Sequence, residues 1–232
     1  MTVELQKIIQ ELYKLLEKKC NSHGIKHALA VLQHVRLALE EEKEMDDNLR
    51  IAIELAALLH DADDRKFFNS VDNENAKHLM RNVPGDIRIK ALEMIDLVSC
   101  SKNKNSVVKN EYYLFPRYAD RLEAIGKIGV WRCFKYCNTI NTPLYTKDTK
   151  RYTNLEELKE TKQRFGVYKG NSDSMMDHFY DKLLHLADFE TENQYFDLEK
   201  NERMQPIINT IMLFGKQGFI TPDQITQLCS EE

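Results

Sequence analysis

Histidines and aspartates occur in this sequence at spacings that suit the ligands of a metal ion. His23 and His27 stand four residues apart at the start of an amphipathic stretch, and the apolar segment "IAIELAALL" runs directly into His60 and Asp61. Asp120 stands within the apolar helical pattern of "ADRLEAIG", where a carboxylate needs a partner. His27, His60, Asp61 and Asp120 would give mixed nitrogen and oxygen ligation with positions left for water and substrate.

The placement of these residues on helices indicates how one ion could be shared. Adjacent residues on an α-helix point about 100° apart, so a single cation could touch both His60 and Asp61. Asp64 follows four residues after His60, and on a helix it would lie over the same side one turn later. From there it could reach a water at the site. The ligand mixture suits Mn, Fe, Co, Ni or Zn better than Ca, and we expect one divalent transition metal, with Mn²⁺ favoured.

Each of these features also has a purely structural explanation. A helix that ends in "DADDRK" could simply face water, and a His-Asp pair is a common dipeptide. A lone histidine on an apolar face is usually a hydrogen-bonded core residue, which is our interpretation of His34 and His185. Cys133 and Cys137 are interpreted as core residues rather than as a zinc pair. The ordered set H-x3-H, HD and ADRL favours metal binding over these explanations.

The elements that must hold these residues are helical by their periodicity. Apolar residues recur at helical spacing over residues 3–16, 27–42 and 48–60, and Asp86 is expected to cap a further helix. A helix over residues 111–136 should be kinked or restarted at Pro116. Two more should cover residues 174–192 and 197–214, and the capping box "TPDQ" should start a last short helix. No long segment alternates with period two, so we predict an all-α fold.

Composition excludes several classes of function. The 232 residues suffice for one sizeable core, and the net charge of -4 offers no basic field for nucleic acid or an anionic membrane surface. No run approaches the roughly 18 apolar residues that span a bilayer. Five cysteines without a CxxC pair fit reduced thiols. We therefore expect a cytoplasmic protein that binds a small molecule, with no nucleic acid and no membrane as partner.

Two stretches are less regular than the rest. Residues 100–110 form a polar loop, and residues 138–173 combine basic, aromatic and turn residues. The second stretch is either a surface connection or a lid over a site, because long loops in compact domains are often functional.

Four blocks of the sequence resemble the HD superfamily of metal-dependent phosphohydrolases, and in particular its YpgQ/YedJ-like branch, which includes nucleotide pyrophosphohydrolases. The blocks are "HGIKHALAV", "LLHDADDRKF", "YADRLEAIGKIG" and "HFYDKLLHL", in the order of the branch and over about residues 20–205. The resemblance implies an HD-domain helical bundle with a C-terminal helical extension. We expect one HD-type domain over residues 1–232, with its core at about 20–137, a lid-like connection at about 138–173 and C-terminal helices at about 174–232.

By their place in these blocks, the four ligand candidates correspond to the metal ligands of the family, and Asp64 to the acid that assists the attacking water. The resemblance also implies residues that face phosphate or the wall of the site. They are His23, Lys66, Arg121, His178 and Lys182, with Arg203 as a further candidate.

The implied activity is hydrolysis of a phosphorylated, nucleotide-like substrate, most simply of a nucleoside triphosphate to the monophosphate and pyrophosphate. Gly24, Ala30 and Tyr118 depart from the pattern of the branch, and none of them is a ligand candidate, so they bear on substrate choice. The alternatives are a 5′-nucleotidase or another phosphomonoesterase or phosphodiesterase of the superfamily. A (p)ppGpp hydrolase shares the ADRL block, but the HFYDKLL block fits the YpgQ-like branch better.

Two other members of the superfamily differ from this sequence in the residues they need. Dinuclear HD enzymes require further histidine ligands, and only His78 lies between the HD pair and Asp120. Degenerate HD domains that serve as binding scaffolds usually lack the HD pair or the distal aspartate, both of which are present. The branch is also compatible with a homodimer, although no heptad seam marks an interface.

Overall fold

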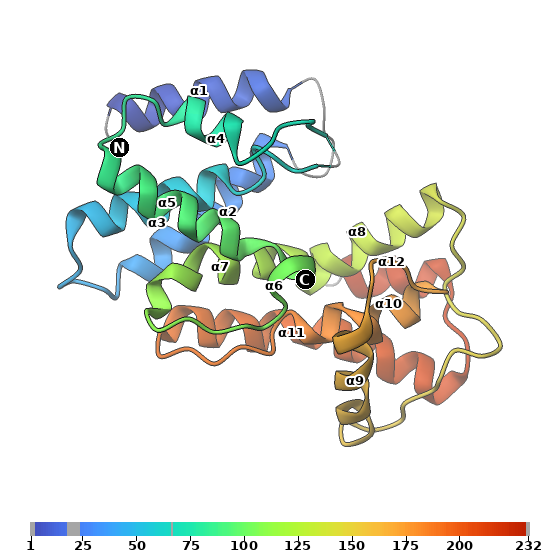
Figure 1. Ribbon diagram of the computed structural model, residues 1–232. Helices are drawn as coiled ribbons and strands as arrows, with labels where there is room; N and C mark the ends of the chain where they lie inside the picture. Colours follow the sequence, from blue (N-terminus) through green and yellow to red (C-terminus); the bar gives the residue numbers. More distant parts are fainter. Residues whose placement is uncertain (1–2, 18–23, 66, 231–232) are drawn as a thin grey trace. The chain divides into compact units, whose positions relative to one another are not determined.

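The computed structural model describes residues 3–17, 24–65 and 67–230 (Figure 1). Its regular elements are all helices, and no strand occurs in these ranges, so the predicted all-α class is confirmed. None of the helices in the described part of the chain combines the length and apolar character that a bilayer-spanning helix needs. The chain divides into two compact units, Met1–Asp120 with Asn193–Phe196, and Arg121–Glu192 with Asp197–Glu232. The expected boundaries within one HD-type domain stay a prediction.

The first unit is built around one apolar helix, α3. Its helices are α1 (Val3–Leu16), α2 (Ile25–Leu39), α3 (Asp47–Leu59), α4 (Glu74–Leu79), α5 (Gly85–Val98), α6 (Cys100–Asn103), η1 (Glu111–Leu114) and the start of α7 (Phe115–Ala124).

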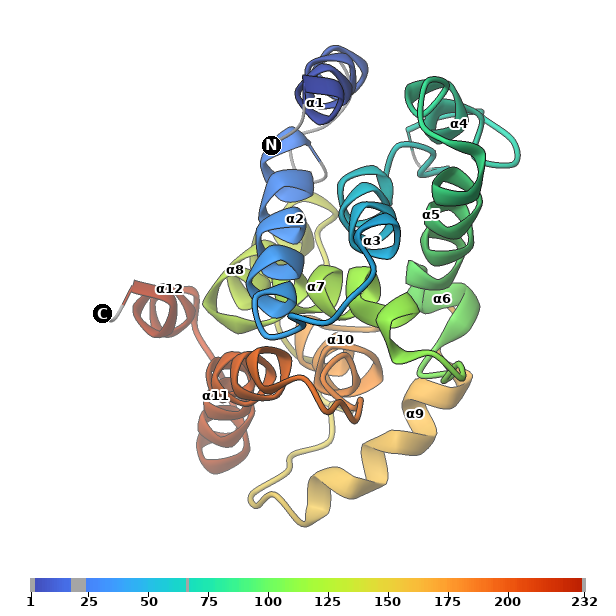
Figure 2. The same cartoon turned by 90° about the vertical axis from the view of Figure 1, so that its left-hand side faces the viewer.

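Helix α3 packs against both α2 and α5, between which it lies in Figure 2. Its small residues Ala52, Ala56 and Ala57 are fully buried, which lets the neighbouring helices approach closely. The Asp46 side chain caps the helix by accepting a hydrogen bond from the backbone N–H of Leu49 at 2.9 Å. The result is a firmly packed support for the residues that follow Leu59.

Residues Asn193–Phe196, which include the first residues of α11, pack within the first unit. The Asn193 side-chain amide donates to the Ala38 carbonyl at 3.0 Å, and the Phe196 ring meets the Phe115 ring edge-on at 5.0 Å. The hydroxyl of Tyr195 hydrogen-bonds to Nδ1 of His34, which is buried. His34 is therefore a hydrogen-bonded core histidine, as predicted.

The second unit contains the end of α7 and the later helices. These are α8 (Gly126–Thr139), η2 (Glu157–Glu160), α9 (Thr161–Val167), α10 (Met175–Asp181), η3 (Leu183–His185), α11 (Gln194–Gln217) and α12 (Pro222–Ser230).

The capping box that starts α12 is confirmed. The Thr221 backbone N–H donates to the Gln224 side chain at 3.0 Å, and the Gln224 N–H donates to the Thr221 hydroxyl at 3.3 Å. The two predicted core cysteines, Cys133 and Cys137 on α8, are both buried.

The restart predicted at Pro116 is confirmed to within one residue, because the 3-10 helix η1 ends at Leu114 and α7 begins at Phe115, which puts Pro116 in the first turn, where its missing N–H leaves no bond unmade. A further break, which we did not predict, lies at Gly126, whose φ of 78° is accessible to glycine at little cost.

Two other helix boundaries differ from those we predicted. Helix α5 begins at Gly85, so Asp86 lies in its first turn rather than at its cap. The helix predicted over residues 174–192 ends at Asp181, since Lys182 has non-helical dihedrals, and Asn193 starts the next helix.

The irregular stretch over residues 138–173 is fastened to the rest of the second unit. Arg151 donates to the Gly215 carbonyl on α11 at 3.0 and 2.7 Å, and the Met175 N–H donates to the Pro143 carbonyl at 2.9 Å. The backbone of Tyr152 lies directly against Gly215, where an added Cβ would come within 1.9 Å of the Tyr152 carbonyl oxygen. This contact requires a residue without a side chain.

We predict that Gly215→Ala destabilises the protein by about 1–3 kcal/mol, because the new methyl group must displace a backbone segment. The matched control is Gly166→Ala on α9, where nothing lies within 4 Å of an added Cβ, so that change should be neutral or slightly stabilising. Urea denaturation of both variants measures the difference. Equal stability of the two would contradict the close contact.

Candidate metal centre

The four predicted ligands meet at one point in the first unit. His27 lies in the first turn of α2, His60 and Asp61 directly follow α3, and Asp120 lies in α7. Nε2 of His27 is 3.3 Å from Nε2 of His60, 3.7 Å from Asp61 Oδ2 and 3.2 Å from Asp120 Oδ1. Nε2 of His60 is 3.4 Å from Asp61 Oδ2 and 3.5 Å from Asp120 Oδ1. Three helices far apart in the sequence thus bring four donor atoms together.

These separations fit a transition metal. Nitrogen and oxygen donors bound at about 2.0–2.2 Å around one ion lie roughly 3.0–3.5 Å from one another. Two imidazoles and two carboxylates form a donor set suited to Mn, Fe, Co, Ni or Zn. His27, His60 and Asp61 each offer a ligand atom, and these three atoms all lie within 4.8 Å of one another.

A backbone carbonyl fixes the orientation of the His60 ring. Nδ1 of His60 lies 2.8 Å from the carbonyl oxygen of Ala57, one turn earlier in α3, and its side chain is only 1% exposed. Because a carbonyl can only accept, Nδ1 carries a proton and donates a hydrogen bond to it. In the neutral ring, the lone pair then lies on Nε2, the atom that faces Asp61 and Asp120. This is the arrangement that a metal-binding histidine requires.

The electrostatics of the cluster call for positive charge at its centre. Burial would lower the pKa of His60, yet Asp61 and Asp120 together raise it well above its usual value. Burial would raise the pKa of Asp120, but its hydrogen bonds with the imidazoles of His27 and His60 hold it well below its usual range. A divalent cation satisfies the same demand when both imidazoles are neutral.

The acids after Asp61 have different surroundings. Asp63 is structural, because its two oxygens accept the backbone N–H groups of Asn75 and Ala76 at the start of α4, each at 3.0 Å. Asp64 is half-buried in a tight turn. The chain leaves the α-helix at Leu59, so our assumption that His60 and Asp64 share one helix is wrong. The role of Asp64 stays a prediction.

The predicted substrate-binding residues lie in several places. His23 and Lys66 fall outside the described residues. Arg121 directly follows Asp120 and is buried, with 1% of its surface exposed. His178 lies on α10 and Lys182 immediately after it, and both are half-buried.

The surroundings of His178 keep its ring neutral near neutral pH. Burial and the nearby charge of Lys182 lower the pKa of His178 to about 4, against an opposing effect of Asp181. Nδ1 of the ring lies 3.2 Å from the hydroxyl of Tyr168, a residue that sequence reasoning missed. Tyr168 belongs to the irregular stretch, and its type and spacing gave no signal.

The histidine predicted to be structural in this unit, His185, has partners on both ring nitrogens. Nδ1 lies 2.8 Å from Asp188 Oδ2, and Nε2 lies 3.1 Å from the hydroxyl of Thr161. The ring is buried, so the prediction of a core histidine is confirmed.

Comparison with known proteins shows one relative of similar length. No family model matches the chain. The chain is 38% identical over 214 residues to the uncharacterized protein L803 of Acanthamoeba polyphaga mimivirus, an alignment that covers 83% of this chain and 88% of that protein.

Solved structures establish the fold. A protein from Lactobacillus plantarum matches with a TM-score of 0.67 at 21% identity, over 94% of this chain and 98% of that one. Bacillus subtilis YpgQ, in complex with ADP, matches with a TM-score of 0.64 at 23% identity, over 93% and 96%. An HD-superfamily hydrolase from Bacillus thuringiensis matches with a TM-score of 0.62 at 24% identity, over 92% and 98%. The YpgQ-like HD fold expected from the four sequence blocks is confirmed.

We predict that His60→Ala abolishes stable metal binding, because it removes the donor whose orientation α3 fixes. The wild-type chain, reconstituted with Mn²⁺ and desalted, should retain about one ion per chain by elemental analysis. The control is His78→Ala, since His78 is exposed on α4 and should leave the metal content unchanged. Full metal content in the His60 variant would contradict the site.

The pKa of His178 predicts a loss of stability in acid. Between its ordinary value of 6.5 and about 4, the unfolded chain binds a proton at His178 that the folded chain does not, so lowering the pH favours unfolding. At about pH 5 this amounts to on the order of 2 kcal/mol. His178→Asn should remove this part of the pH dependence in denaturant titrations at neutral and acidic pH. If the free energy of unfolding falls equally with acid in the wild type and in His178→Asn, the lowered pKa of His178 is wrong.

Proposed function

Because the chain belongs to the same family as the mimivirus protein L803 and has the fold of HD-superfamily hydrolases, we propose that it is a metal-dependent phosphohydrolase. Its substrate is a nucleoside triphosphate, which it cleaves to the monophosphate and pyrophosphate. The observation that carries the proposal is the convergence of His27, His60, Asp61 and Asp120 on one point. The structural neighbours named as YpgQ with ADP and as a hydrolase support a nucleotide substrate and an enzyme.

A mononuclear centre agrees with the histidines available in the described ranges. His78 is the remaining histidine between Asp61 and Asp120, and its side chain is exposed on α4. Its neighbours on α4 include Asn75 and Ala76, whose backbone N–H groups are bound by Asp63. A second metal of the dinuclear HD type would therefore lack its histidine ligands.

The chemistry divides between the metal and the side chains around it. A bound divalent ion would lower the pKa of water and polarise a phosphoryl oxygen. His27, His60, Asp61 and Asp120 would hold that ion, and Asp64 accepts the proton of the water that attacks the α-phosphorus. The bond from that phosphorus to the bridging oxygen breaks, and pyrophosphate leaves. Lys66, Arg121, His178 and Lys182 supply charge and hydrogen bonds to the phosphates, since positioning and electrostatics carry most of phosphoryl-transfer catalysis.

The location, metal and assembly are further parts of the proposal. We place the protein in the cytoplasm, where Cys100, Cys133, Cys137 and Cys229 would stay reduced. Mn²⁺ is the metal we propose, and a homodimer is the assembly we propose by analogy with the branch.

The test is a product assay. The Mn²⁺-loaded protein is incubated with ribo- and deoxynucleoside mono-, di- and triphosphates, and chromatography separates pyrophosphate from orthophosphate. We expect pyrophosphate and monophosphate from triphosphates, and a loss of about 10²- to 10⁴-fold in rate for Asp64→Asn, which removes the base. Asp72→Asn serves as the control for a nearby acid, because Asp72 is exposed and asparagine tolerates its positive φ, and this variant should keep the rate of the wild type.

Other outcomes decide between the classes. Orthophosphate from monophosphates alone would make the protein a nucleotidase. Absence of turnover with a full complement of bound Mn²⁺ would refute the nucleotide substrate. Equal loss of rate in the two aspartate variants would refute the assigned role of Asp64.

A further inference from the structure

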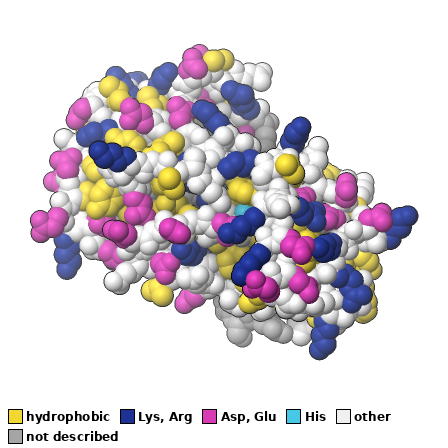
Figure 3. Space-filling model, turned by 60° about the horizontal axis from the view of Figure 1, so that its bottom comes forward, with side chains coloured by type: hydrophobic (Ala, Val, Ile, Leu, Met, Phe, Trp, Pro, Cys, Tyr) yellow, Lys and Arg dark blue, Asp and Glu magenta, His cyan; other side chains and the backbone are white. Residues whose placement is uncertain are grey.

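A buried guanidinium lies one helical turn before Asp120 in the first unit. Arg117 is the third residue of α7, and only 1% of its surface is exposed. Lysine and arginine side chains belong mostly to protein surfaces, where Figure 3 shows many of them. A buried charge requires hydrogen-bond partners that offset the loss of water. The partners of Arg117 therefore indicate what this side chain holds in place.

Arg117 joins α7 to two segments that precede it in the chain. Its Nε donates to the Leu97 carbonyl at 2.7 Å, and its Nη1 donates to the Ser106 carbonyl at 2.5 Å. Leu97 lies in the last turn of α5, where carbonyls lack partners within the helix and the helix dipole favours a cation. Ser106 lies in the connection between α6 and η1. One side chain thus fixes the start of α7 against the end of α5.

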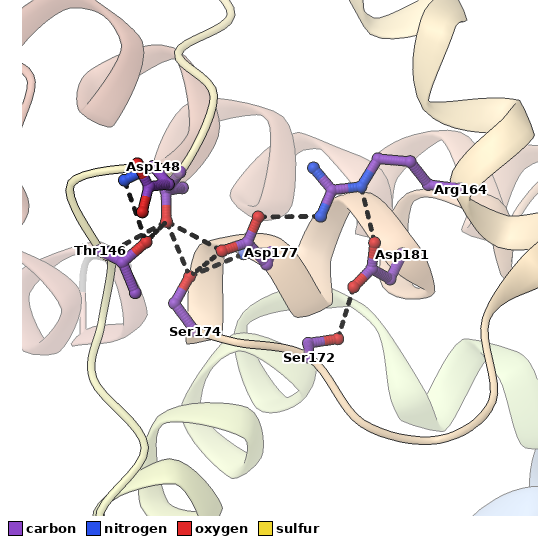
Figure 4. A network of polar contacts seen from close by, with 8 residues as sticks. Thr146, Asp148, Arg164, Ser172, Ser174, Asp177 and Asp181 are labelled. Atoms are coloured by element: carbon purple, nitrogen blue, oxygen red, sulfur yellow. Dashed lines mark hydrogen bonds and ion pairs between the residues drawn. The ribbon is translucent and has the colours of Figure 1, made fainter.

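Arg164 in the second unit offers a comparison. It binds Asp177 and Asp181, which both lie on α10, at 2.8 and 2.7 Å (Figure 4). Those bonds join side chains of two neighbouring helices. The two carbonyls at Arg117 belong to separate segments of the backbone, so the bonds of Arg117 restrain the path of the main chain itself.

Helix α5 connects Arg117 to the other ligands of the metal centre. It packs against α3, whose end carries His60 and Asp61. Ala91 and Met94 of α5 are fully buried. Because closely packed interiors have low compressibility, a bond between α7 and α5 also sets the distance between Asp120 and the ligands that follow α3.

Aromatic packing holds α7 less strictly than these hydrogen bonds do. The rings of Phe115 and Tyr118 meet the Phe196 ring edge-on, with centroids 5.0 and 5.6 Å apart. Such ring pairs are favourable over a wide range of separations. A hydrogen bond accepts only a narrow range of distance and angle. The guanidinium of Arg117 is therefore the stricter restraint on where α7 begins.

We propose that Arg117 is a positioning residue of the metal centre, which acts by holding Asp120 at bonding distance from the ion. The inference rests on the metal centre of the proposed function. Asp120 Oδ1 lies 3.2 Å from Nε2 of His27 and 3.5 Å from Nε2 of His60. Metal–ligand distances vary by only about 0.2 Å, so a small shift of α7 would weaken the bond from Asp120.

The experiment is a titration of the metal-free protein with Mn²⁺, in which electron paramagnetic resonance measures the free ion. Arg117→Met removes both hydrogen bonds and should weaken binding by about 10- to 100-fold, the range for residues that orient metal ligands. Arg117→Lys keeps the charge and one donor group, so its loss of affinity should be smaller.

The matched control is Arg50→Met. Arg50 also donates to two backbone carbonyls, those of Leu39 at 3.0 Å and Glu42 at 2.6 Å. These bonds join the end of α2 to the start of α3, and the ligands lie at the opposite ends of both helices. Arg50→Met should therefore bind Mn²⁺ like the wild type. Equal weakening in the two variants would overturn the proposal.

A double-mutant cycle separates the positioning of Asp120 from a general loss of structure. In an Asp120→Asn background the positioned carboxylate is gone, so Arg117→Met should change the affinity by at most about 2-fold. In an Asp61→Asn background it should keep its full effect. An equal effect of Arg117→Met in both backgrounds would overturn the proposal.

The visible spectrum of the Co²⁺-loaded protein provides a second readout, because it depends on the number and geometry of the ligands. Arg117→Met should shift the spectrum toward that of Asp120→Asn, whereas Arg50→Met should leave it unchanged. A wild-type spectrum in Arg117→Met would overturn the proposal. Thermal melts establish that each variant is folded, and Arg117→Lys replaces Arg117→Met in every comparison if the latter does not fold.

Neither readout requires turnover, which separates this inference from the proposed function. If the Mn²⁺-loaded protein hydrolyses triphosphates but its metal affinity ignores Arg117→Met, the inference fails alone. If metal binding depends on Arg117 as expected but no nucleotide is hydrolysed, the proposed reaction fails alone.

Discussion

The need for positive charge among closely packed donor atoms is the constraint on which the first unit depends. The Nε2 atoms of His27 and His60 lie 3.2–3.7 Å from each other and from carboxylate oxygens of Asp61 and Asp120, an arrangement that is stable only with protons on the imidazoles or a cation among the four side chains. Close helix packing supplies the restraint. The buried alanines of α3 let α2 and α5 pack tightly, and the Ala57 carbonyl fixes the ring of His60. Firmly packed helices hold such geometry better than loops do.

Neighbouring acids carry different tasks, and their hydrogen bonds show which. Asp61 faces the imidazoles, whereas Asp63 ties the turn to the first residues of α4. In the second unit, Asp177 and Asp181 form ion pairs with Arg164 and accept hydrogen bonds from hydroxyl groups. The hydrogen bonds of Asp63, Asp177 and Asp181 account for structural roles of these three acids.

The features that could be predicted from sequence are those with a local cause. The capping box of Thr221 and Gln224 spans four residues, and the meeting of His27 with His60 could be expected from the ordered motif blocks. Features that depend on contacts distant in the fold could not. The additional break at Gly126 depends on the positive φ that the backbone adopts there.

The parts of the site that sequence analysis did not predict also depend on contacts between residues distant in the fold or on the backbone. The Ala57 carbonyl that orients His60 belongs to the backbone, which every residue has. Tyr168 meets His178 through the course of an irregular stretch that no periodicity describes. The placement of Asp64 one helical turn after His60 was assumed from their spacing, whereas α3 ends at Leu59 and a turn follows, in which Asp63 binds the first residues of α4.

The most direct test of the metal centre is diffraction from crystals grown with Mn²⁺, with data collected at the manganese absorption edge. We expect a single anomalous peak per chain, within bonding distance of Nε2 of His27 and His60 and of carboxylate oxygens of Asp61 and Asp120. A peak at another position, or a cluster of the same four side chains without one under saturating Mn²⁺, would contradict this expectation.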